Sequence, residues 1–434
     1  MASTYLTRTP SSSGNRKTWT LSMWVKRSND NYSQLSGTGT GSTYLIIGFG
    51  DTQPRILQST NAGEQVSVQI NNKCRDVNAY YHLVFRVDTT QATASNRIRI
   101  YINGEEGTYS ETDYPSQNLD MYYNYNILHG IGARSDGDSG FDGIISHVHF
   151  ADGQSLAPTV FGETDSTTGE WKIIVSPSFT LGTNGFTILK DGNTITDQST
   201  NSNNWTVASG GTLTKTEDCP SNVFATWNSL FRKGTSTPAF SNGSLTSTFN
   251  DAGANEFALT TLGASSGKYY AEIKWVSATG TGATSTGILD MGYSGTADPN
   301  NAVTNTFAYF GNGNKNVSGS ASSYGSSYTS GDIIGIAMDL DNNKLYFSKN
   351  GTWQNSGVPT SGSTGTGAIS TIAGVTYGFM TSDYNNKVCQ LNTGNGYFGT
   401  TAVSSAGTNA SGNGIFEYDV PTGFTALSTK GLNL

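Results

Sequence analysis

The chain has 434 residues, a formal net charge of −8 and only 13% charged residues. This length predicts two or three domains with cores of their own. The acidic balance argues against nucleic acid as a partner, because gripping phosphates requires a basic patch. No apolar run approaches the roughly 18 residues of a membrane helix, and the first residues, MASTYLTRTP, lack an apolar signal core.

Composition favours many short strands. The chain contains 53 glycines and 48 aromatic residues (22 Tyr, 19 Phe and 7 Trp), a balance typical of packed sandwiches with polar turns rather than of disorder. Cys74, Cys219 and Cys389 are scattered along the chain. We expect them to be small apolar positions and not a disulfide framework.

Residues 1–160 read as a first set of strands. Residues 19–26, WTLSMWVK, alternate, so that Trp19, Leu21, Met23 and Val25 share one face and Trp24 lies on the other. Further strands are expected at residues 44–49, 55–57, 65–70, 82–88, 96–105, 127–133 and 141–150. In the last of these, the pattern places Ile144, Ser146, Val148 and Phe150 on one face, and Ile145, His147 and His149 on the other.

Residues 161–221 are polar and are expected to connect two domains as an ordered but irregular segment. One or two strands are expected within it, one of them at residues 185–190, which either completes the first sandwich or bridges to the second. In the next domain, strands are expected at residues 259–262, 268–276, 287–293 and 376–381.

The most organised stretch is residues 331–353, GDIIGIAMDLDNNKLYFSKNGTW. Ile334, Ile336, Met338 and Leu340 fall two apart and share a face, and a turn at residues 341–343 leads to a return strand with Leu345 and Phe347. Asn350-Gly351 predicts a second tight turn. The stretch therefore predicts a β-meander with one apolar face, and residues 82–105 repeat its plan. After it, residues 416–420 are expected to form a short closing strand stopped by Pro421, which pairs with a sandwich or lies against a neighbouring subunit.

Two family resemblances follow from these patterns. The 331–353 hairpin resembles the signature hairpin of SPRY domains, and this resemblance extends from about Trp227 to Leu391. The order WTLSMWVK, YYHLVFRVD, RIRIYINGE and FDGIISHVHFADGQSLAP, over residues 18–158, resembles the laminin-G/concanavalin A-like lectin and glucanase superfamily. Residues 3–28 and 80–105 look most like lectin-like domains in structural proteins of tailed bacteriophages, where an SPRY-like domain can follow.

The resemblances imply an all-β fold with two antiparallel β-sandwich domains in tandem, of jelly-roll, concanavalin A-like and SPRY-like type. The expected boundaries are 1–160 for the lectin-like domain, 161–221 for the connecting segment, 222–395 for the SPRY-like domain and 396–434 for a C-terminal extension.

Aromatic side chains beside amides are the first candidates for a binding site. Tyr122, Tyr123, Asn124 and Tyr125 lie together in MYYNYN, and tyrosine faces flanked by amides suit the stacking of sugar rings. Tyr324 and Tyr328 are a second such pair. The alternative for both groups is burial in the core or in an oligomer interface.

Acidic residues are the candidates for metal binding and catalysis. Asp136, Asp138 and Asp142 offer closely spaced oxygen ligands of the kind that calcium prefers, and lectin-like domains often bind calcium. The alternative is a routine turn before a strand, so we expect no cofactor, with calcium as the open possibility. His147 and His149 share a face, but further zinc ligands are not evident.

Catalysis by a carboxylate pair is not expected. Glu163-Thr164-Asp165, with Glu170, is the nearest approach to the motif of related glucanases, and Glu111-Thr112-Asp113 is no better. A serine nucleophile elbow, a phosphate-binding loop and a dinucleotide fingerprint are also missing from the sequence.

The resemblance implies a non-enzymatic bacteriophage virion protein. The first reading is a tail fibre, spike or adhesin that recognises a host-surface glycan or protein. The alternative is a head decoration or head-fibre protein that contacts other virion subunits, and a glycan depolymerase is a third reading. We expect assembly in the host cytoplasm, display on the outer surface of the particle, other virion proteins as partners, and a homo-oligomer for which a trimer is the working guess.

Overall fold

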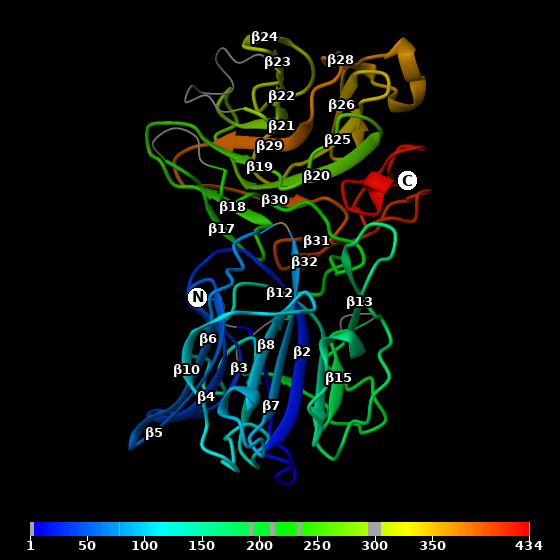
Figure 1. Cartoon of the computed structure of the whole chain (residues 1–434). Coiled ribbons are helices and arrows are strands. Elements are labelled where there is room, and N and C mark those ends of the chain that lie inside the picture. Colours follow the sequence, from blue (N-terminus) through cyan, green and yellow to red (C-terminus); the bar gives the residue numbers. More distant parts are fainter. Residues whose placement is uncertain are drawn as a thin grey trace. The chain divides into compact units, whose positions relative to one another are not determined.

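The computed structural model describes residues 4–77, 79–190, 194–208, 213–231, 236–293 and 305–433. The chain divides into two compact units, Met1–Lys215 and Thr216–Leu434. Each unit is built from packed β-sheets, the first drawn in blue to green and the second in green to red (Figure 1). Among the described residues, no helix is both long and apolar enough to cross a membrane.

The described part of the first unit contains sixteen strands and two short 3-10 helices. In chain order these are β1 (Leu6–Arg8), β2 (Thr18–Arg27), β3 (Ser33–Thr40), β4 (Thr43–Gly50), β5 (Gln53–Thr60), β6 (Gly63–Ile70), β7 (Tyr80–Asp88), η1 (Ala94–Asn96), β8 (Ile98–Ile102), β9 (Glu105–Glu106), β10 (Tyr109–Asp113), β11 (His129–Ile131), β12 (Gly143–Asp152), η2 (Pro158–Val160), β13 (Gly162–Thr164), β14 (Trp171–Ile173), β15 (Phe186–Ile188) and β16 (Thr206–Val207).

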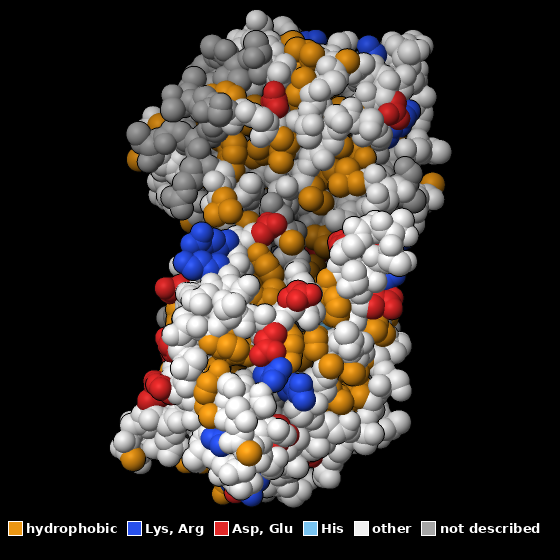
Figure 2. All heavy atoms as spheres, in the orientation of Figure 1, with side chains coloured by type: hydrophobic (Ala, Val, Ile, Leu, Met, Phe, Trp, Pro, Cys, Tyr) orange, Lys and Arg blue, Asp and Glu red, His pale blue; other side chains and the backbone are white. Residues whose placement is uncertain are grey.

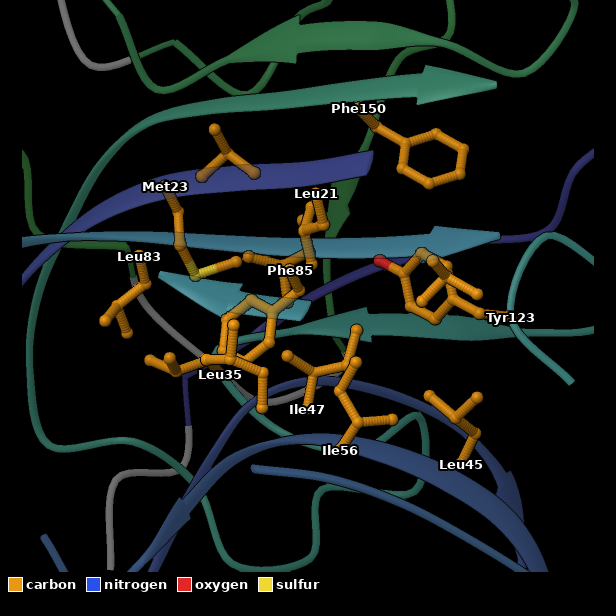
Figure 3. Packing of buried hydrophobic residues seen from close by; sticks show 14 of the residues in the cluster. Leu21, Met23, Leu35, Leu45, Ile47, Ile56, Leu83, Phe85, Tyr123 and Phe150 are labelled. Carbon is orange, nitrogen blue, oxygen red and sulfur yellow. The ribbon is translucent and has the colours of Figure 1, made fainter. Parts of the chain in front are cut away.

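Two antiparallel sheets make the sandwich of this unit. Among the described residues, one has eight strands in the order β10-β6-β5-β4-β3-β11-β1-β16, and the other has six in the order β15-β12-β2-β7-β8-β9. Alternating apolar residues of both sheets meet in one core, and Figure 3 shows Leu21 and Met23 of β2 facing Ile47 of β4 and Ile56 of β5. The prediction that Trp19, Leu21, Met23 and Val25 share a buried face is confirmed.

One face assignment is wrong, because a bulge interrupts β12. Ser146 pairs with Trp24 and His149 pairs with Ser22, so two β12 residues, His147 and Val148, oppose a single β2 residue. His147 has a φ of 48°, which lies in the left-handed region. An extra residue shifts the alternation by one place. As a result, Ile145, and not Ile144, packs with Val148 and Phe150 against the core.

Residues 161–215 belong to the first unit. β15 pairs with β12, and β16 pairs with β1, so these strands extend both sheets. Ile188 and Trp205 lie in the same core as β2. The expected strand at residues 185–190 therefore completes the first sandwich.

The outward face of the six-stranded sheet is covered by residues 153–181, which we call the strap. Phe161 and Phe179 of the strap pack on His149 (5.7 and 5.9 Å between ring centroids). Trp171 stacks on His82 (5.9 Å), whose other face stacks on Trp24 (4.8 Å). Gly104 and Gly162 leave room for the indole, because a Cβ on either would lie within 2.7 Å of the Trp171 ring.

The strap also determines which ring nitrogen of His82 carries the proton. Trp171 Nε1 donates to His82 Nδ1 (3.0 Å), and His82 Nε2 lies 2.9 Å from Ser22 Oγ. The neutral ring must therefore carry its proton on Nε2. Burial lowers the pKa of His82 to about 3 and that of His129 to about 4. The pKa of His149 is lowered well below its usual value by burial and then by neighbouring positive charges. The first unit thus folds around neutral histidines.

The described part of the second unit contains β17 (Ala239–Ser241), β18 (Thr246–Phe249), β19 (Glu256–Leu259), β20 (Lys268–Ser277), β21 (Ser285–Asp290), β22 (Thr306–Phe310), β23 (Asn314–Val317), β24 (Ser320–Ser323), β25 (Ile333–Asp339), β26 (Lys344–Lys349), β27 (Thr352–Trp353), η3 (Gln354–Ser356), η4 (Pro359–Thr364), β28 (Ile369–Ser370), β29 (Tyr377–Asp383), β30 (Lys387–Asn392), β31 (Tyr397–Phe398), β32 (Thr401–Ala402), β33 (Thr425–Ala426) and η5 (Gly431–Asn433).

This unit is a second sandwich. Its described residues form a nine-stranded sheet, with the path β17-β18-β30-β20-β25-β26-β27 and with β28 and β33 alongside, and a six-stranded sheet in the order β19-β29-β21-β22-β23-β24. The predicted meander is present as β25, β26 and β27. Ile334, Ile336, Met338, Leu345 and Phe347 all lie in the core, as their spacing predicts. Asn350 and Gly351 have φ values of 47° and 79°, as expected for the tight turn.

The C-terminal segment, residues 404–429, covers the outward face of the nine-stranded sheet. Its Phe416, Val420 and Phe424 pack against Tyr270 and Tyr346. The predicted strand at residues 416–420 is wrong, because that stretch is irregular and β33, at Thr425–Ala426, supplies the pairing with β20 instead.

A buried carboxylate fixes this segment to the sheet. Glu272 of β20 accepts hydrogen bonds from the backbone N–H groups of Glu417 (2.9 Å) and Tyr418 (2.8 Å), and from the side chains of Tyr270 and Asn392 (both 3.2 Å). Burial outweighs these donors and raises the pKa of Glu272 to about 7. The C-terminal segment of the second unit is therefore held to the nine-stranded sheet by a titratable group.

The two units should respond to pH in opposite directions between pH 8 and pH 5. The first should lose stability on acidification. Histidines of the unfolded chain take up protons near pH 6.5, whereas His82 and His129 of the folded chain stay neutral until about pH 3 to 4. For Glu272, the folded pKa lies above the unfolded value of 4.5, so its contribution is complete below pH 4.5 and is lost as the pH rises through about 7. Each pKa unit is worth about 1.4 kcal/mol.

Scanning calorimetry of the whole chain at pH 5, 6, 7 and 8 measures both shifts. The control is Glu272→Gln, which should remove the pH-dependent shift of the second unit's transition and leave that of the first, which contains all four histidines. Two transitions that moved in the same direction in the unsubstituted chain would contradict this assignment.

Candidate functional site

The predicted tyrosine loop is partly a core element. Tyr123 is 2% exposed and lies in the sandwich core beside Phe85 and Leu45 (Figure 3). Its hydroxyl is 2.8 Å from Ser36 Oγ, and its ring packs edge-on against His129 at 5.0 Å. This side chain cannot offer a face to a sugar, so the core alternative holds for Tyr123.

Asn124 is the centre of a buried hydrogen-bond network. It is 2% exposed, and its Nδ2 donates to Asp152 Oδ1 (2.6 Å) while its Oδ1 accepts from Asn184 Nδ2 (2.8 Å). Asp152 in turn accepts from the backbone N–H groups of Asn15 (2.7 Å) and Asn184 (3.0 Å). The amide predicted to bind a ligand therefore joins three chain segments to the end of β12.

Tyr125 and Tyr122 remain accessible in part. Tyr125 is 38% exposed, and Tyr122 is half-buried. The Arg16 guanidinium lies over both rings, 4.3 Å from the centroid of Tyr125 and 5.9 Å from that of Tyr122. Of the predicted loop, only Tyr125 presents a substantial aromatic surface.

Tyr324 and Tyr328 are core residues of the second unit, with 5% and 1% exposure. Tyr328 donates to the Tyr309 carbonyl (2.7 Å), and Tyr324 donates weakly to the Gly367 carbonyl (3.4 Å). The prediction of a binding pair here is wrong, because both rings fill the space between the two sheets.

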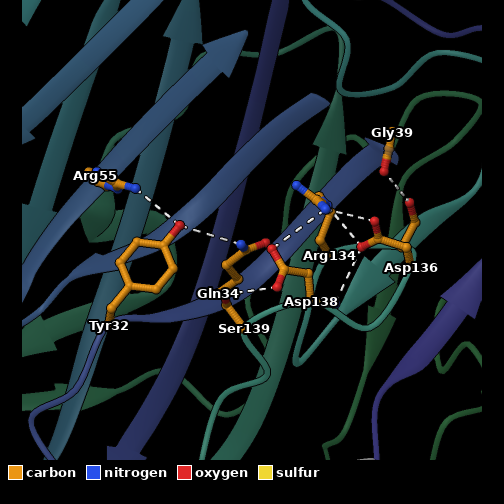
Figure 4. A network of polar contacts seen from close by, with 9 residues as sticks. Tyr32, Gln34, Gly39, Arg55, Arg134, Asp136, Asp138 and Ser139 are labelled. Atoms are coloured by element: carbon orange, nitrogen blue, oxygen red, sulfur yellow. Dashed lines mark hydrogen bonds and ion pairs between the residues drawn. The ribbon is translucent and has the colours of Figure 1, made fainter. Parts of the chain in front are cut away.

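The three predicted calcium ligands are already occupied by protein groups. Arg134 donates to both carboxylate oxygens of Asp136 (2.8 and 2.7 Å) and lies 3.5 Å from Asp138 (Figure 4). Asp142 accepts from Asn29 Nδ2 (3.2 Å). Within the described part of the chain, no group of three or more His, Cys, Asp or Glu residues could hold a metal ion. The turn alternative describes these residues better, with Arg134 in place of a cation.

This arginine belongs to a row of side chains on the outward face of the eight-stranded sheet, which we call the outward strip: Tyr32, Gln34, Tyr44, Arg55 and Arg134. At one end, Arg55 lies 4.9 Å from the centroid of the Tyr32 ring and donates to its hydroxyl (3.1 Å). At the other end, Arg134 lies 4.9 Å from the centroid of the Tyr44 ring. Figure 4 shows Arg55, Tyr32 and Gln34 at one end, and Arg134 with Asp136 and Asp138 at the other.

The strip is long enough for an extended ligand. Tyr44 and Phe49 are five residues apart on β4, and Ser33, next to Tyr32, pairs with Phe49. The two tyrosines are therefore separated by six residues, or roughly 20 Å, along the strand direction. Between them, Ile46 of β4 and Leu57 of β5 pair with each other and are buried. Aromatic ends and a few polar groups are features of a ligand-binding surface.

The strip could not be recognised in the sequence. Its residues are spread from position 32 to position 134, and only the sheet register brings them together. β3 carries the sequence SQLSGTGT, whose polar and glycine residues give no strand signal. In the sequence, Arg55 is only the first residue of the strand expected at residues 55–57.

The carboxylates predicted as the nearest approach to a catalytic pair are exposed and share one lysine. Lys172 Nζ lies 3.3 Å from Glu163 and 3.2 Å from Asp165. Hydrogen bonds from Thr167, Thr168 and Lys172 lower the pKa of Asp165 to about 2. A general acid needs a raised pKa, so this arrangement does not resemble a glycosidase centre.

Comparison with known proteins agrees with the two sandwiches. The family model of the concanavalin A-like lectin/glucanases superfamily matches residues 2–160, and that of the SPRY domain matches residues 268–396. The chain therefore carries an N-terminal concanavalin A-like lectin domain and a C-terminal SPRY domain, and the predicted all-β tandem fold is confirmed.

Three solved structures are similar to part of the chain. The SPRY domain of human HERC1 is 18% identical with a TM-score of 0.29, and covers 36% of this chain and 91% of its own. A human SPRY domain is 18% identical with a TM-score of 0.27, and covers 36% and 94%. The TRIM65 PSpry domain is 10% identical with a TM-score of 0.30, and covers 39% and 91%. Comparison with curated proteins gave no match.

Asn124→Ala should destabilise the first unit, whereas Tyr125→Ala should not. The first substitution removes the buried hydrogen bonds of Asn124 to Asp152 and Asn184, at a cost of about 1–3 kcal/mol. The second removes a half-exposed ring and should change the free energy of unfolding by less than about 0.5 kcal/mol. Urea denaturation followed by circular dichroism measures both, and equal effects would argue against a structural role for Asn124.

Proposed function

We propose that this chain, with its lectin-like domain followed by an SPRY domain, is a non-enzymatic binding protein on the surface of a tailed-bacteriophage virion. Its role is that of a tail fibre, spike or similar adhesin that recognises a host-surface glycan. The observation that carries the proposal is the outward strip, where two accessible tyrosine rings, each under an arginine, lie on one sheet face.

The chemistry of the strip suits sugars. Pyranose rings stack their C–H faces on aromatic side chains, and their hydroxyls exchange hydrogen bonds with amide and guanidinium groups. Tyr32 is 38% exposed and Tyr44 is half-buried, so both can contact a ligand without unfolding. Their spacing would let a short oligosaccharide touch both rings at once.

Three observations support the absence of catalysis in this proposal. Glu163 and Asp165 both lie against Lys172. The buried Asp152 already accepts hydrogen bonds from three N–H donors. Glu272 binds the backbone of the C-terminal segment. Asp152 lies on β12 of the six-stranded sheet and not on the eight-stranded sheet that carries the strip. Binding, rather than bond cleavage, is what the strip can perform.

The virion setting rests on the resemblance of residues 3–28 and 80–105 to phage lectin-like domains. In this setting the protein is assembled in the host cytoplasm and displayed on the outer surface of the particle, with other virion proteins as partners. A homo-oligomer, with a trimer as the first possibility, belongs to the same proposal. Decoration of the head, in place of host recognition, is the outcome to be separated by experiment.

Tyr44→Ala and Tyr32→Ala should each weaken binding of the purified chain to host cells by about tenfold, because each removes one stacking surface. Tyr125→Ala is the matched control: it removes a tyrosine that also lies beneath an arginine, but outside the strip, and should bind like the unsubstituted chain. Flow cytometry with labelled protein, with and without competing cell-surface polysaccharide, measures the effect.

Binding to emptied capsids distinguishes the alternative. A receptor-binding protein should associate with cells and be competed by polysaccharide. Association with emptied capsids alone, unaffected by either strip substitution, would contradict the proposal and indicate a head decoration protein.

A further inference from the structure

We infer that Tyr32, Gln34 and Arg55 form the anchoring point for the carboxylate of an acidic sugar, such as a uronic or sialic acid residue. This inference rests on the proposed function and specifies which class of glycan the outward strip takes. It follows from three features of the three side chains: an uncompensated positive charge, a hydroxyl proton with no acceptor, and a buried amide oxygen with no donor.

Arg55 carries a positive charge that no acidic group of the described chain balances. Its guanidinium makes one hydrogen bond there, from Nη2 to the Tyr32 hydroxyl (3.1 Å), and its buried Nε has no partner among the described residues. Arg134, at the other end of the strip, instead faces Asp136 and Asp138. An anionic ligand is therefore drawn to the Arg55 end and not to the Arg134 end.

Charged side chains are sparse in this chain. On the face in view in Figure 2, the described charged side chains form small scattered groups among uncharged surface, as expected for a chain with 13% charged residues. The guanidinium has five N–H donors in a planar fork, which matches the two oxygens of a carboxylate. One of the five is used within the described residues.

The Tyr32 hydroxyl is placed as a second donor. Its oxygen accepts hydrogen bonds from Arg55 Nη2 (3.1 Å) and Gln34 Nε2 (3.4 Å). Because both lone pairs are then engaged, the hydroxyl proton remains to be donated. The geometry places this donor beside the guanidinium, where both can reach the same carboxylate.

Gln34 supplies the complementary acceptor. The residue is 2% exposed, and its Oε1 has no hydrogen-bond donor among the described residues. A buried polar atom without a partner costs free energy that a ligand hydroxyl can recover. A sugar acid offers both a carboxylate for the Arg55–Tyr32 donors and hydroxyls for this oxygen, whereas inorganic phosphate offers only the anion.

The position of the trio also favours a sugar over an isolated anion. The Tyr32 ring is stacked beneath Arg55 and is 38% exposed, so a pyranose can cover its free edge while its carboxylate meets the guanidinium. From there the strand direction of β4 leads toward Tyr44, the second accessible ring of the strip. An acidic residue at one end of an oligosaccharide, followed by neutral residues, fits this order.

Paired probes test the inference on the full-length chain: 3′-sialyllactose against lactose, and trigalacturonic acid against the neutral galactotriose. Isothermal titration calorimetry at 50 mM and 300 mM NaCl should show at least about tenfold tighter binding of one acidic probe than of its neutral partner, reduced at the higher salt. Inorganic phosphate at millimolar concentration should compete weakly. Comparison of the two acidic probes distinguishes sialic from uronic acid.

Two variants and one control locate the anchor. Arg55→Gln should remove the preference for the acidic probe by about tenfold or more, and Tyr32→Phe, which keeps the ring but removes the hydroxyl, should reduce it by a smaller factor. Arg99→Gln is the matched control, because it removes the same charge from an arginine that is ion-paired with Glu106 on the six-stranded sheet. Circular dichroism and thermal melting confirm that each variant is folded.

The outcomes separate the two proposals. Equal affinity for acidic and neutral probes, or an acidic preference that survives both Arg55→Gln and Tyr32→Phe, would overturn the anchoring site and leave glycan recognition standing. Binding of none of these probes, or of the surface polysaccharide, would overturn glycan recognition together with the inference. Tight competition by inorganic phosphate would show a general anion site and would also overturn it.

Discussion

A β-sheet has two faces, and packing two sheets together buries only one face of each. The two sandwiches of this chain therefore leave four outward faces, and the rest of the structure depends on how these faces are covered. Three of them are covered by the chain itself. The strap, residues 153–181, covers the six-stranded sheet of the first unit, and residues 404–429 cover the nine-stranded sheet of the second. Phe231, Met291 and Tyr293 pack on the six-stranded sheet of the second unit. The outward face of the eight-stranded sheet instead carries the outward strip, with its accessible tyrosines and arginines.

Buried polar groups hold the strap, the N-terminal segment and the C-terminal segment in place. His82 bonds the strap through Trp171, Asp152 bonds the N-terminal segment and the tyrosine loop, and Glu272 bonds the C-terminal segment. Each of these three makes two or more hydrogen bonds with described residues. A buried polar group that is fully paired specifies one packing arrangement, since any shift would leave it unpaired. Arg55 and Gln34 of the strip differ from these three in having buried atoms without a partner among the described residues, and the proposal of a ligand at the strip rests in part on that difference.

The fold was largely predictable from the sequence, because alternation and turn chemistry are local. The WTLSMWVK strand and the 331–353 meander obey both rules, and the structure follows them residue by residue. The failures are non-local. The bulge at His147 reverses the faces of β12, and β15 and β16 join the first sandwich through pairings that no local pattern records. β3 has no apolar alternation at all, although it lies in the middle of the eight-stranded sheet.

The candidate site was much less predictable. Residue type suggested that tyrosines and aspartates would bind ligands, but burial decides whether a tyrosine is a surface or a core residue, and Tyr123, Tyr324 and Tyr328 are core. In the same way, Arg134 turns Asp136 and Asp138 from possible metal ligands into ion-pair partners. The strip depends on the register of β3, β4 and β5, which brings together residues distant in sequence. Only the assembled sheet reveals it.

Hydroxyl-radical footprinting, with tyrosine oxidation read by mass spectrometry in the presence and absence of the bound polysaccharide, tests this account most directly. Tyr32, Tyr44 and Tyr125 are all accessible in part and act as reporters on the same unit. If the outward strip is the ligand face, Tyr32 and Tyr44 should be protected from oxidation while Tyr125 is not. Protection of Tyr125 with unchanged oxidation of Tyr32 and Tyr44 would contradict the account and return the binding site to the tyrosine loop.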